Sequence, residues 1–328
     1  MREGAIPSRG YPCGMQLLSA SAGRWKVGEP LEITLRTLTP LWTGGAGMSH
    51  DRLHETGILG SLRWWCEALV RGLGGAACDP TESGVRCPDD DGRRCAVCEL
   101  FGCTGWQRKF KLRFLGEQPP ASVTSAIGLG SGRTMTWQFF ELRGIAPDEW
   151  WLLYQALRIA AEWGAIGGRT PRKPQANQKV GGDYGLIAIL GCRRPPDVGR
   201  EHVRAHLQDS RFRRPTDAAW PDLRNFFFVR GAFLWRREIN ALLGKSDDGR
   251  RNVSNGPLEI ALRGCKGGPG VAAQSKRIFS FKTPPGRLWG YLPDPHLRDM
   301  AIERVKGLLQ GRARRLEVRT GEEVLHGL

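Results

Sequence analysis

Hydrophobic and polar side chains alternate along residues 107–115, and this alternation predicts a β-strand. The two sets are Phe110, Leu112 and Phe114 on one face and Lys109, Lys111 and Arg113 on the other. We expect the apolar face to pack on a core and the cationic face to point outward. A strand with such a cationic face suits the binding of phosphate groups.

The rest of the N-terminal half predicts strands and helices in a recognisable order. Strands are expected at residues 31–35, 134–143 and 183–190. Apolar side chains recur at helical spacing through residues 58–73, and a proline followed by two acidic residues begins a second helix over residues 147–163. The order is β-α-β-β-α-β, the ferredoxin-like pattern. This scaffold is common among RNA-recognition modules, whose open sheet face receives unpaired bases.

The C-terminal half is less regular and follows a polar, arginine-rich connector. Its pattern predicts strands at residues 223–229, 258–263, 277–281 and 316–319, and helices at residues 233–243 and 295–309. We therefore predict an α+β fold of two tandem ferredoxin-like (RRM-like) domains. The expected divisions are a flexible N-terminal extension at 1–30, a first domain at 31–190 with an insertion at 78–104, and a second, irregular domain at 191–328.

The net charge of the chain indicates that the predicted fold binds a partner of opposite charge. The chain has 328 residues, with 49 Lys+Arg against 33 Asp+Glu, which gives a net charge of +16. Such an excess favours a polyanionic partner, with nucleic acid ahead of a membrane surface or a merely solvated cationic surface. No run of apolar residues is long enough to span a membrane, and residues 1–30 lack the apolar region of a signal peptide. We expect a cytoplasmic protein.

Four of the nine cysteines are clustered in the insertion: Cys78, Cys87, Cys95 and Cys98. The last two form a Cys-x2-Cys knuckle, whose spacing lets both thiolates reach one tetrahedral ion. The cluster therefore predicts a structural zinc site that is closed to catalysis, although Cys103 can replace one of the four. Reduced loop thiols without a metal are the alternative. Cys66 is expected to be an ordinary core thiol.

Two basic segments rich in glycine are candidates for phosphate contact. Residues 166–173 contain Gly167, Gly168 and Arg169, and residues 260–293 carry six Lys/Arg and no acidic residue, with aromatic side chains interleaved. Glycine lets backbone N–H groups approach a phosphate closely, and aromatics beside cations suit stacking on unpaired bases. A mobile solvated loop is the alternative for the first segment, and a core role for the aromatics is the alternative for the second.

A third candidate is the helix N-terminus that follows the Gly-Gly turn of residues 39–45. A free helix end attracts phosphate through its N–H groups and its dipole. Trp64 and Trp65 are consecutive on this helix, so they cannot both face the same way. We expect one of them to lie in the core and the other to be available to a partner, with ordinary helix packing as the alternative for both.

Two histidine pairs suggest an enzyme as a minority hypothesis. His50 and His54 are four residues apart, as are His202 and His206. Such a pair can share a helix face, bind a metal or transfer protons. However, glycines surround the first pair, and no third ligand is placed. No Ser-His-Asp, Cys-His or paired-carboxylate arrangement stands out in the sequence.

These motifs together resemble the RAMP superfamily of CRISPR-associated proteins. The resemblance rests on TPLWTGG (residues 39–45), GILGSLRWW (57–65), the Cys knuckle followed by ELFG (99–102), and Gly-Gly-Arg at 167–169. It covers residues 31–190 well and is thinner beyond, where it depends mainly on LWGYLP (288–293). Within the superfamily, the chain is similar to the first-subunit family of Cmr-type (type III-B) effector complexes.

The resemblance implies a non-catalytic subunit of a ribonucleoprotein in antiviral defence. Such subunits sit at one end of the complex, contact the crRNA 3′ region, the target RNA and neighbouring subunits, and leave target cleavage to a different subunit. Two alternatives stay open: a guide-RNA-processing endoribonuclease with His50 or His54 in acid–base roles, and a protein scaffold with little RNA contact. The predicted RNA-contacting residues are Arg63, Lys109, Lys111, Arg113, Gly167, Gly168, Arg169, Arg172, Lys173, Lys179, Lys276 and Arg277.

Overall fold

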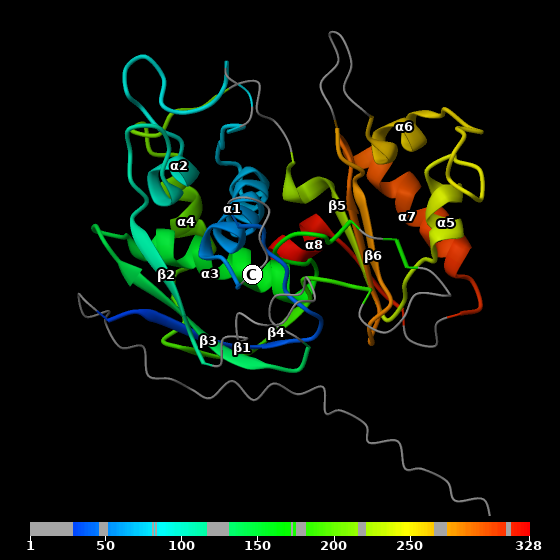
Figure 1. Ribbon diagram of the computed structural model, residues 1–328. Helices are drawn as coiled ribbons and strands as arrows, with labels where there is room; N and C mark the ends of the chain where they lie inside the picture. The colour runs from blue at the N-terminus through cyan, green and yellow to red at the C-terminus, as the bar shows by residue number, and fades with distance from the viewer. Residues whose placement is uncertain are drawn as a thin grey trace, which may run out of the picture.

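The computed structural model describes residues 29–45, 52–80, 82, 84–116, 131–171, 173–174, 182–215, 221–265, 274–312 and 316–328. Within these residues the chain forms two four-stranded antiparallel sheets, each with its own helices (Figure 1). No helix in the described ranges has the length and apolar character needed to cross a membrane.

The first sheet has the strand order β2-β3-β1-β4. Its unit consists of β1 (Leu31–Thr37), α1 (Glu55–Gly72), α2 (Ala96–Phe101), β2 (Phe110–Leu115), β3 (Thr134–Glu141), α3 (Pro147–Glu162) and β4 (Ile187–Arg193), with α4 (Arg200–Leu207) packed on α3. One helix follows β1 and another follows β3, so strand order and connectivity match the ferredoxin-like pattern expected from the sequence. We call this part the first unit.

Local sequence explains why these elements form. In β2 buried and exposed positions alternate strictly: Phe110, Leu112 and Phe114 are buried as predicted, and Lys111, Arg113 and the apolar Leu115 are exposed. Helix α3 begins with Pro147 at its first position, and the Glu149 carboxylate accepts the backbone N–H of Ala146 at 2.9 Å. Helices α1 and α3 cover one face of the first sheet and leave its other face uncovered by helices (Figure 1).

The second sheet repeats the same topology in the order β6-β7-β5-β8. Its unit consists of β5 (Phe226–Arg230), α5 (Arg236–Leu242), α6 (Pro257–Arg263), β6 (Ile278–Phe281), β7 (Arg287–Tyr291), α7 (Pro295–Leu309) and β8 (Glu317–Thr320). A short 3-10 turn, η2 (Leu223–Asn225), precedes β5, and α8 (Gly321–His326) contacts both α1 and β5. We call the strands β5–β8 with α5–α7 the second unit.

Two sequence predictions fail in the second unit. Residues 258–263 form helix α6 and not a strand, because Pro257 starts a helix and the buried Leu258, Ala261 and Leu262 recur at helical spacing. Strand β7 was missed because all five of its residues are buried, so its sequence shows no alternation.

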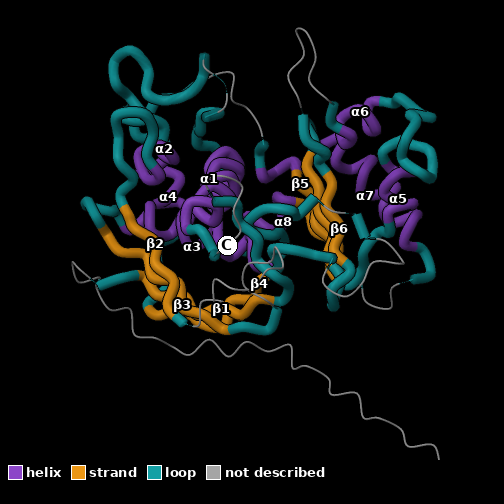
Figure 2. Tube along the Cα trace, in the orientation of Figure 1, coloured by secondary structure: helices purple, strands orange, loops and turns teal. Residues whose placement is uncertain are grey.

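Strands β5, β6 and β7 of the second sheet are covered on both faces, so almost all of their residues are buried, whereas β8 at the edge is half exposed. Phe227, Val229, Ile278 and Leu288 belong to the core shared with α5, α6 and α7. The alternate residues on the same strands, which include Phe226, Phe228, Trp289 and Tyr291, belong to the core of the first unit. In Figure 2 the three helices lie on the side of this sheet that faces away from α1. The two units are therefore joined by a continuous aromatic interface.

Helix α1 supplies the opposite side of this interface with both of its tryptophans. The Trp64 ring lies 5.4 Å from Tyr291, and the Trp65 ring lies 5.1 Å from Trp289, centroid to centroid. Arg287 reinforces the junction, because its Nη1 donates to the carbonyl oxygens of Ala161 at 2.8 Å and Gly164 at 2.7 Å. Trp65 is a core residue, as expected of one of the two, whereas Trp64 is half-buried and packs against the same sheet.

Replacement of Gly164 by alanine is expected to destabilise the protein through this interface. A Cβ at this position would overlap the Trp65 ring, which is buried and donates its indole N–H to Ala165 O at 2.9 Å. Overpacking of this kind costs about 1–3 kcal/mol, so Gly164→Ala should lower the midpoint of thermal unfolding followed by circular dichroism.

Gly307→Ala is the matched control, because Gly307 lies inside α7 and a Cβ there meets no described atom within 4 Å. It should leave stability unchanged or raise it by about 0.5–1 kcal/mol. Equal unfolding midpoints for the two variants would contradict the close packing of the Trp65 ring against Gly164.

Candidate functional site

A groove of about 440 Å³ lies between the two units at the N-terminal end of α1. We call it the interdomain groove. The first unit lines it with the turn at 42–44, the first turns of α1 and the loop at 165–171, and the second unit lines it with Ser275, Phe279, Trp289 and Tyr291. None of the described residues that line the groove is acidic.

Two glycine turns that are far apart in the sequence meet on the first-unit side. Gly168 donates its N–H to the carbonyl oxygen of Trp42 at 2.8 Å. Gly167 has φ of +82°, and a Cβ on Gly168 would overlap the Trp42 ring, so both positions require glycine. Arg169 has its guanidinium 4.7 Å from the Trp42 ring centroid. The structure thus brings together two motifs that the sequence analysis treated separately.

The start of α1 is held against the same turn. The backbone N–H of His54 donates to Thr43 Oγ1 at 2.8 Å, and Gly57 lies so close to Thr43 that a Cβ would sit 2.8 Å from its side chain. The N-cap residue His54 makes no side-chain cap hydrogen bond. The positive end of the α1 dipole therefore points toward the groove without a side-chain cap from its own N-cap residue.

Aromatic side chains form the opposite wall. Phe279 and Trp289 stack with centroids 3.9 Å apart and planes 11° from parallel. Trp289 is only 3% exposed, and its indole Nε1 has no hydrogen-bond partner among the described residues. A buried N–H donor without an acceptor is unfavourable, so this side of the groove is well suited to a ligand that brings an acceptor.

Two lysines predicted from sequence lie at the rim of the groove and are held by neutral acceptors. Lys276 Nζ donates to Pro171 O at 3.0 Å, and Lys173 Nζ donates to Asn240 Oδ1 at 2.6 Å. Burial, together with the charge of Lys173, lowers the pKa of Lys276 to about 7. Burial and the nearby Lys245 and Arg236 lower the pKa of Lys173 to about 8. An anion would relieve this mutual repulsion.

The uncovered face of the first sheet holds a second cationic surface. Lys111 and Arg113 are exposed on β2, and neither forms an ion pair with any described residue. The guanidinium of Arg113 lies 5.2 Å from the Phe140 ring centroid on the neighbouring strand. Cations beside an aromatic ring on an open sheet suit contact with phosphate and base together.

Lys109 does not join this surface, which corrects the predicted face. It precedes β2, its Nζ contacts Glu149 at 2.9 Å and Glu99 at 3.2 Å, and its side chain is 12% exposed. The strand begins only at Phe110, so the alternation that would turn Lys109 outward does not extend to it. Its charge is neutralised by two carboxylates inside the fold.

Arg63 and Arg277 likewise use their charges internally. Arg63 donates to Gly102 O at 2.7 Å, to Glu67 at 2.8 Å and to Cys98 Sγ at 2.9 Å. Arg277 is 7% exposed and donates to Ala261 O at 3.1 Å and to Gln274 Oε1 at 2.8 Å. We therefore keep both out of the proposed RNA contacts. Arg172 and Lys179 lie outside the described residues.

The second histidine pair lies beside a buried carboxylate. His202 Nδ1 lies 2.7 Å from Asp148 Oδ1, and His206 Nδ1 lies 3.8 Å from Asp148 Oδ2, so the second pair meets a buried carboxylate. Burial lowers the pKa of His206. His54 is the N-cap of α1, and His50 lies outside the described residues.

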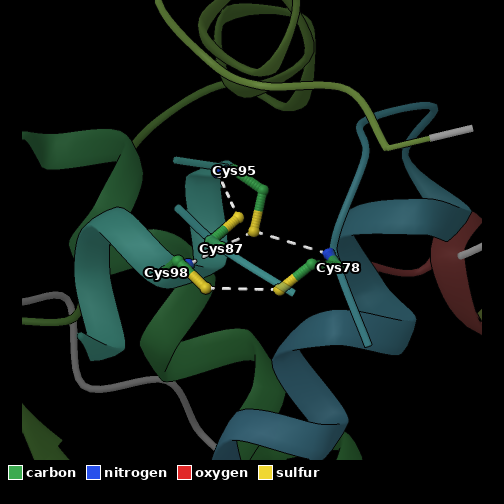
Figure 3. Close-up of side chains that lie close together, drawn as sticks. All are labelled: Cys78, Cys87, Cys95 and Cys98. Atoms are coloured by element: carbon green, nitrogen blue, oxygen red, sulfur yellow. Dashed lines mark hydrogen bonds between the residues drawn. The ribbon is translucent and has the colours of Figure 1, made fainter. Parts of the chain in front are cut away.

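The four clustered cysteines converge on one buried point (Figure 3). Their sulfur atoms all lie within 4.8 Å of one another, and none forms a disulfide. Backbone N–H groups also point at sulfur: Cys95 N donates to Cys87 Sγ at 3.3 Å, and Cys98 N donates to Cys95 Sγ at 3.4 Å. Hydrogen bonds from the other three thiols lower the pKa of Cys87. We call these four residues the thiolate cluster.

The thiolate cluster fits a tetrahedral metal ion. Zn–S bonds of about 2.3 Å place the sulfurs of such a site about 3.8 Å apart, a spacing that these side chains reach with small shifts. All four ligands come from the protein, so a bound ion would be structural and would have no position for a substrate. Cys103 is half-buried and is not one of the four.

Three arginines connect the thiolate cluster to its surroundings. Burial alone would lower the pKa of Arg63, but the Cys98 thiolate and Glu67 raise the pKa above its usual value. Arg213, in the connector between the units, donates to Arg86 O at 2.7 Å and lies 3.8 Å from Cys87 Sγ. Arg71 donates to Cys78 O at 3.1 Å and to Pro221 O at 3.0 Å. Arg71 and Arg213 thus tie the insertion to the C-terminal part of the connector, which spans residues 193–221.

Comparison with known proteins finds one family to which the first unit is similar. Residues 34–172 match the family model of the RAMP superfamily. The matched residues run from β1 to the loop that follows α3. This match confirms the resemblance found in the sequence, and no curated protein is significantly similar to the whole chain.

Several solved structures are also similar in outline. The apo crystal structure of Cmr1 from Pyrococcus furiosus is 11% identical with a TM-score of 0.46, over 89% of this chain and 99% of that chain. A chain of the type III-B Cmr-β complex bound to cognate target RNA is 10% identical with a TM-score of 0.45, over 85% and 99% of the two chains.

Metal removal is expected to release the connector. With the cluster loaded, Arg213 is held against the insertion, so trypsin should cut slowly after Arg211 and Arg213. The purified chain should contain about one ion, and strong chelation or Cys95→Ser should remove the ion and speed up cleavage there. Limited proteolysis followed by mass spectrometry measures this.

Cys192→Ser is the control, because Cys192 lies on β4 outside the cluster. It should keep both the ion and the slow cleavage. Unchanged cleavage at the connector after complete loss of the ion would show that the cluster does not hold this segment.

Proposed function

We propose that this protein is a non-catalytic RNA-binding subunit of a type III (Cmr-type) CRISPR ribonucleoprotein effector. It binds crRNA or target RNA and contacts neighbouring effector subunits in the cytoplasm during antiviral defence. The interdomain groove is the observation that carries the proposal. It combines glycine turns, a helix N-terminus, stacked aromatics and rim lysines, with no acidic residue among its described lining.

Charge and family both support RNA as the polyanion. The net charge of +16 favours a nucleic acid, and the RAMP match covers the strands and helices that build the first-unit side of the groove. Lys111 and Arg113 on the open sheet supply a second contact surface. RNA that crosses from this sheet to the groove would meet cations at both places.

The thiolate cluster fits Zn²⁺ as a structural ion in this proposal. Four thiolates are the preferred ligand set of structural zinc, and the cluster is buried away from the groove lining. The chain's own residues position the insertion through Arg63, Arg71 and Arg213. Zinc would then hold the basic scaffold in shape and take no part in contacting RNA.

A non-catalytic role agrees with the arrangement of the histidines. His54 lies at the α1 N-cap, where its backbone N–H is bonded to Thr43 Oγ1, and none of the described residues that line the groove is a histidine or an acidic residue. RNA incubated with the protein should remain intact on a denaturing gel. Cleavage that disappears in both His50→Ala and His54→Ala would replace this proposal with the endoribonuclease alternative.

Binding to single-stranded RNA should be strongly salt-dependent, because phosphate neutralisation releases counterions. Lys111→Ala with Arg113→Ala should lower affinity roughly three- to tenfold and reduce the slope of log K against log salt by about 1.4, or about 0.7 for each cation removed. Fluorescence anisotropy over a salt series measures both quantities.

Lys306→Ala with Arg319→Ala removes the same charge from cations paired with Glu303 and Glu317 in the second unit. This control should leave affinity and slope near those of the unmodified protein. Weak, salt-independent RNA binding by the unmodified protein, together with binding to an acidic sibling subunit, would favour the scaffold alternative.

RNA affinity should also fall as pH rises from about 6.5 to 8.5. The pKa of Lys276 is lowered to about 7, so its ammonium charge is largely present at the lower pH and lost at the higher. A bound phosphate favours the charged form, so binding takes up a proton in this window. Lys276→Met should flatten the profile, whereas Lys306→Met should retain it. An identical profile for Lys276→Met would exclude Lys276 from the RNA contact.

A further inference from the structure

We propose that the interdomain groove holds one unstacked nucleobase of the bound RNA. The inference rests on the proposed RNA-binding function and specifies what the groove takes from the RNA. The groove volume of about 440 Å³ lies within the range of about 300–1,000 Å³ typical of small-molecule sites. A stacked RNA segment is too large for such a space, whereas a base turned out of the strand is not.

The walls of the groove offer the contacts that a base uses. Phe279 and Trp289 form a stacked pair on the second unit, and Trp64 faces them from α1 at 6.0 Å from Trp289. Aromatic side chains stack on unpaired bases regardless of base identity. These rings lie in two different units, so the base site exists only when both units are packed together.

One buried polar group favours a nucleobase over an apolar ligand as the occupant of the groove. Trp289 lies in the groove lining, is 3% exposed, and has an indole N–H without a partner among the described residues. Base carbonyl oxygens and ring nitrogens are hydrogen-bond acceptors that can satisfy it. A purely apolar ligand would leave this donor buried and unsatisfied.

The rim suits the phosphates on either side of a bound base. Lys276 reaches from the second unit to Pro171 of the first and has its Nζ 5.8 Å from the Phe279 ring centroid. Arg169 lies over Trp42 on the other unit. An aromatic cleft between cations, with no acidic residue in its described lining, is complementary to a nucleotide, because the rings stack on the base and the cations pair with its phosphates.

Gly60 provides a way to block the groove without disturbing its walls. It lies on the exposed side of α1, lines the groove, and a Cβ there meets no described atom within 4 Å. Gly307 on α7 is exposed in the same way, meets no described atom, and lies outside the groove lining. Gly60→Leu and Gly307→Leu are therefore a matched pair of substitutions.

The experiment uses the full chain and single-stranded RNAs in which one position at a time lacks its base but keeps its phosphate. For the unmodified protein and Gly307→Leu, one position should lose affinity roughly tenfold when its base is absent. Gly60→Leu should bind intact RNA about tenfold more weakly, and base removal at that position should cause no further loss. Thermal unfolding of both variants checks that they fold alike.

A second measurement does not depend on any variant. 2-Aminopurine placed at the sensitive position should lose fluorescence on binding, because stacking on aromatic rings quenches it. If RNA binds in a salt-dependent way but removal of any single base leaves the affinity unchanged, the proposed base site is wrong and the proposed RNA-binding function is retained. Equal weakening of all RNAs by Gly60→Leu would show that the groove holds only backbone or a protein partner, and complete failure to bind RNA would overturn both proposals.

Discussion

The packing of α1 against the aromatic face of the second sheet is the interaction on which the structure depends. Trp64 and Trp65 enter this interface from one unit, and Phe226, Trp289 and Tyr291 enter it from the other. Arg287 fixes the same junction by bonding the carbonyls of Ala161 and Gly164. Because large aromatic surfaces are buried here, the two units behave as one body with a defined groove at the edge of the interface.

Glycine makes this groove possible. Gly168 lets the loop lie against the Trp42 ring, and Gly57 lets α1 approach Thr43. The same residues leave the groove lined by backbone and aromatic rings, with Gly60 facing open space. A surface made of small residues, rings and rim cations is the kind that receives unpaired nucleotides, and its two halves come from segments more than 100 residues apart in the chain.

The cations of this basic chain perform two different tasks. Arg63, Arg71 and Arg213 turn inward to the thiolate cluster and the backbone around it, where they position the insertion and the connector. Lys111, Arg113 and Lys276 remain at surfaces where a phosphate can reach them. The net charge is therefore a poor guide to which cation meets RNA, since an arginine bonded to carbonyls and thiolates has few donors left.

The sequence by itself determined the features that local periodicity and spacing control. These are the β2 face with Lys111 and Arg113, helix α3 with its proline start, and the cysteines that converge on one point. Only the tertiary structure decided that Lys109 pairs with Glu149, that Arg277 is buried, that residues 257–263 are helical, and that the turn at Trp42 meets Gly168. The physical reason is that periodicity reports which face of an element avoids water, whereas the partner of a charge or of a ring is set by segments distant in the chain.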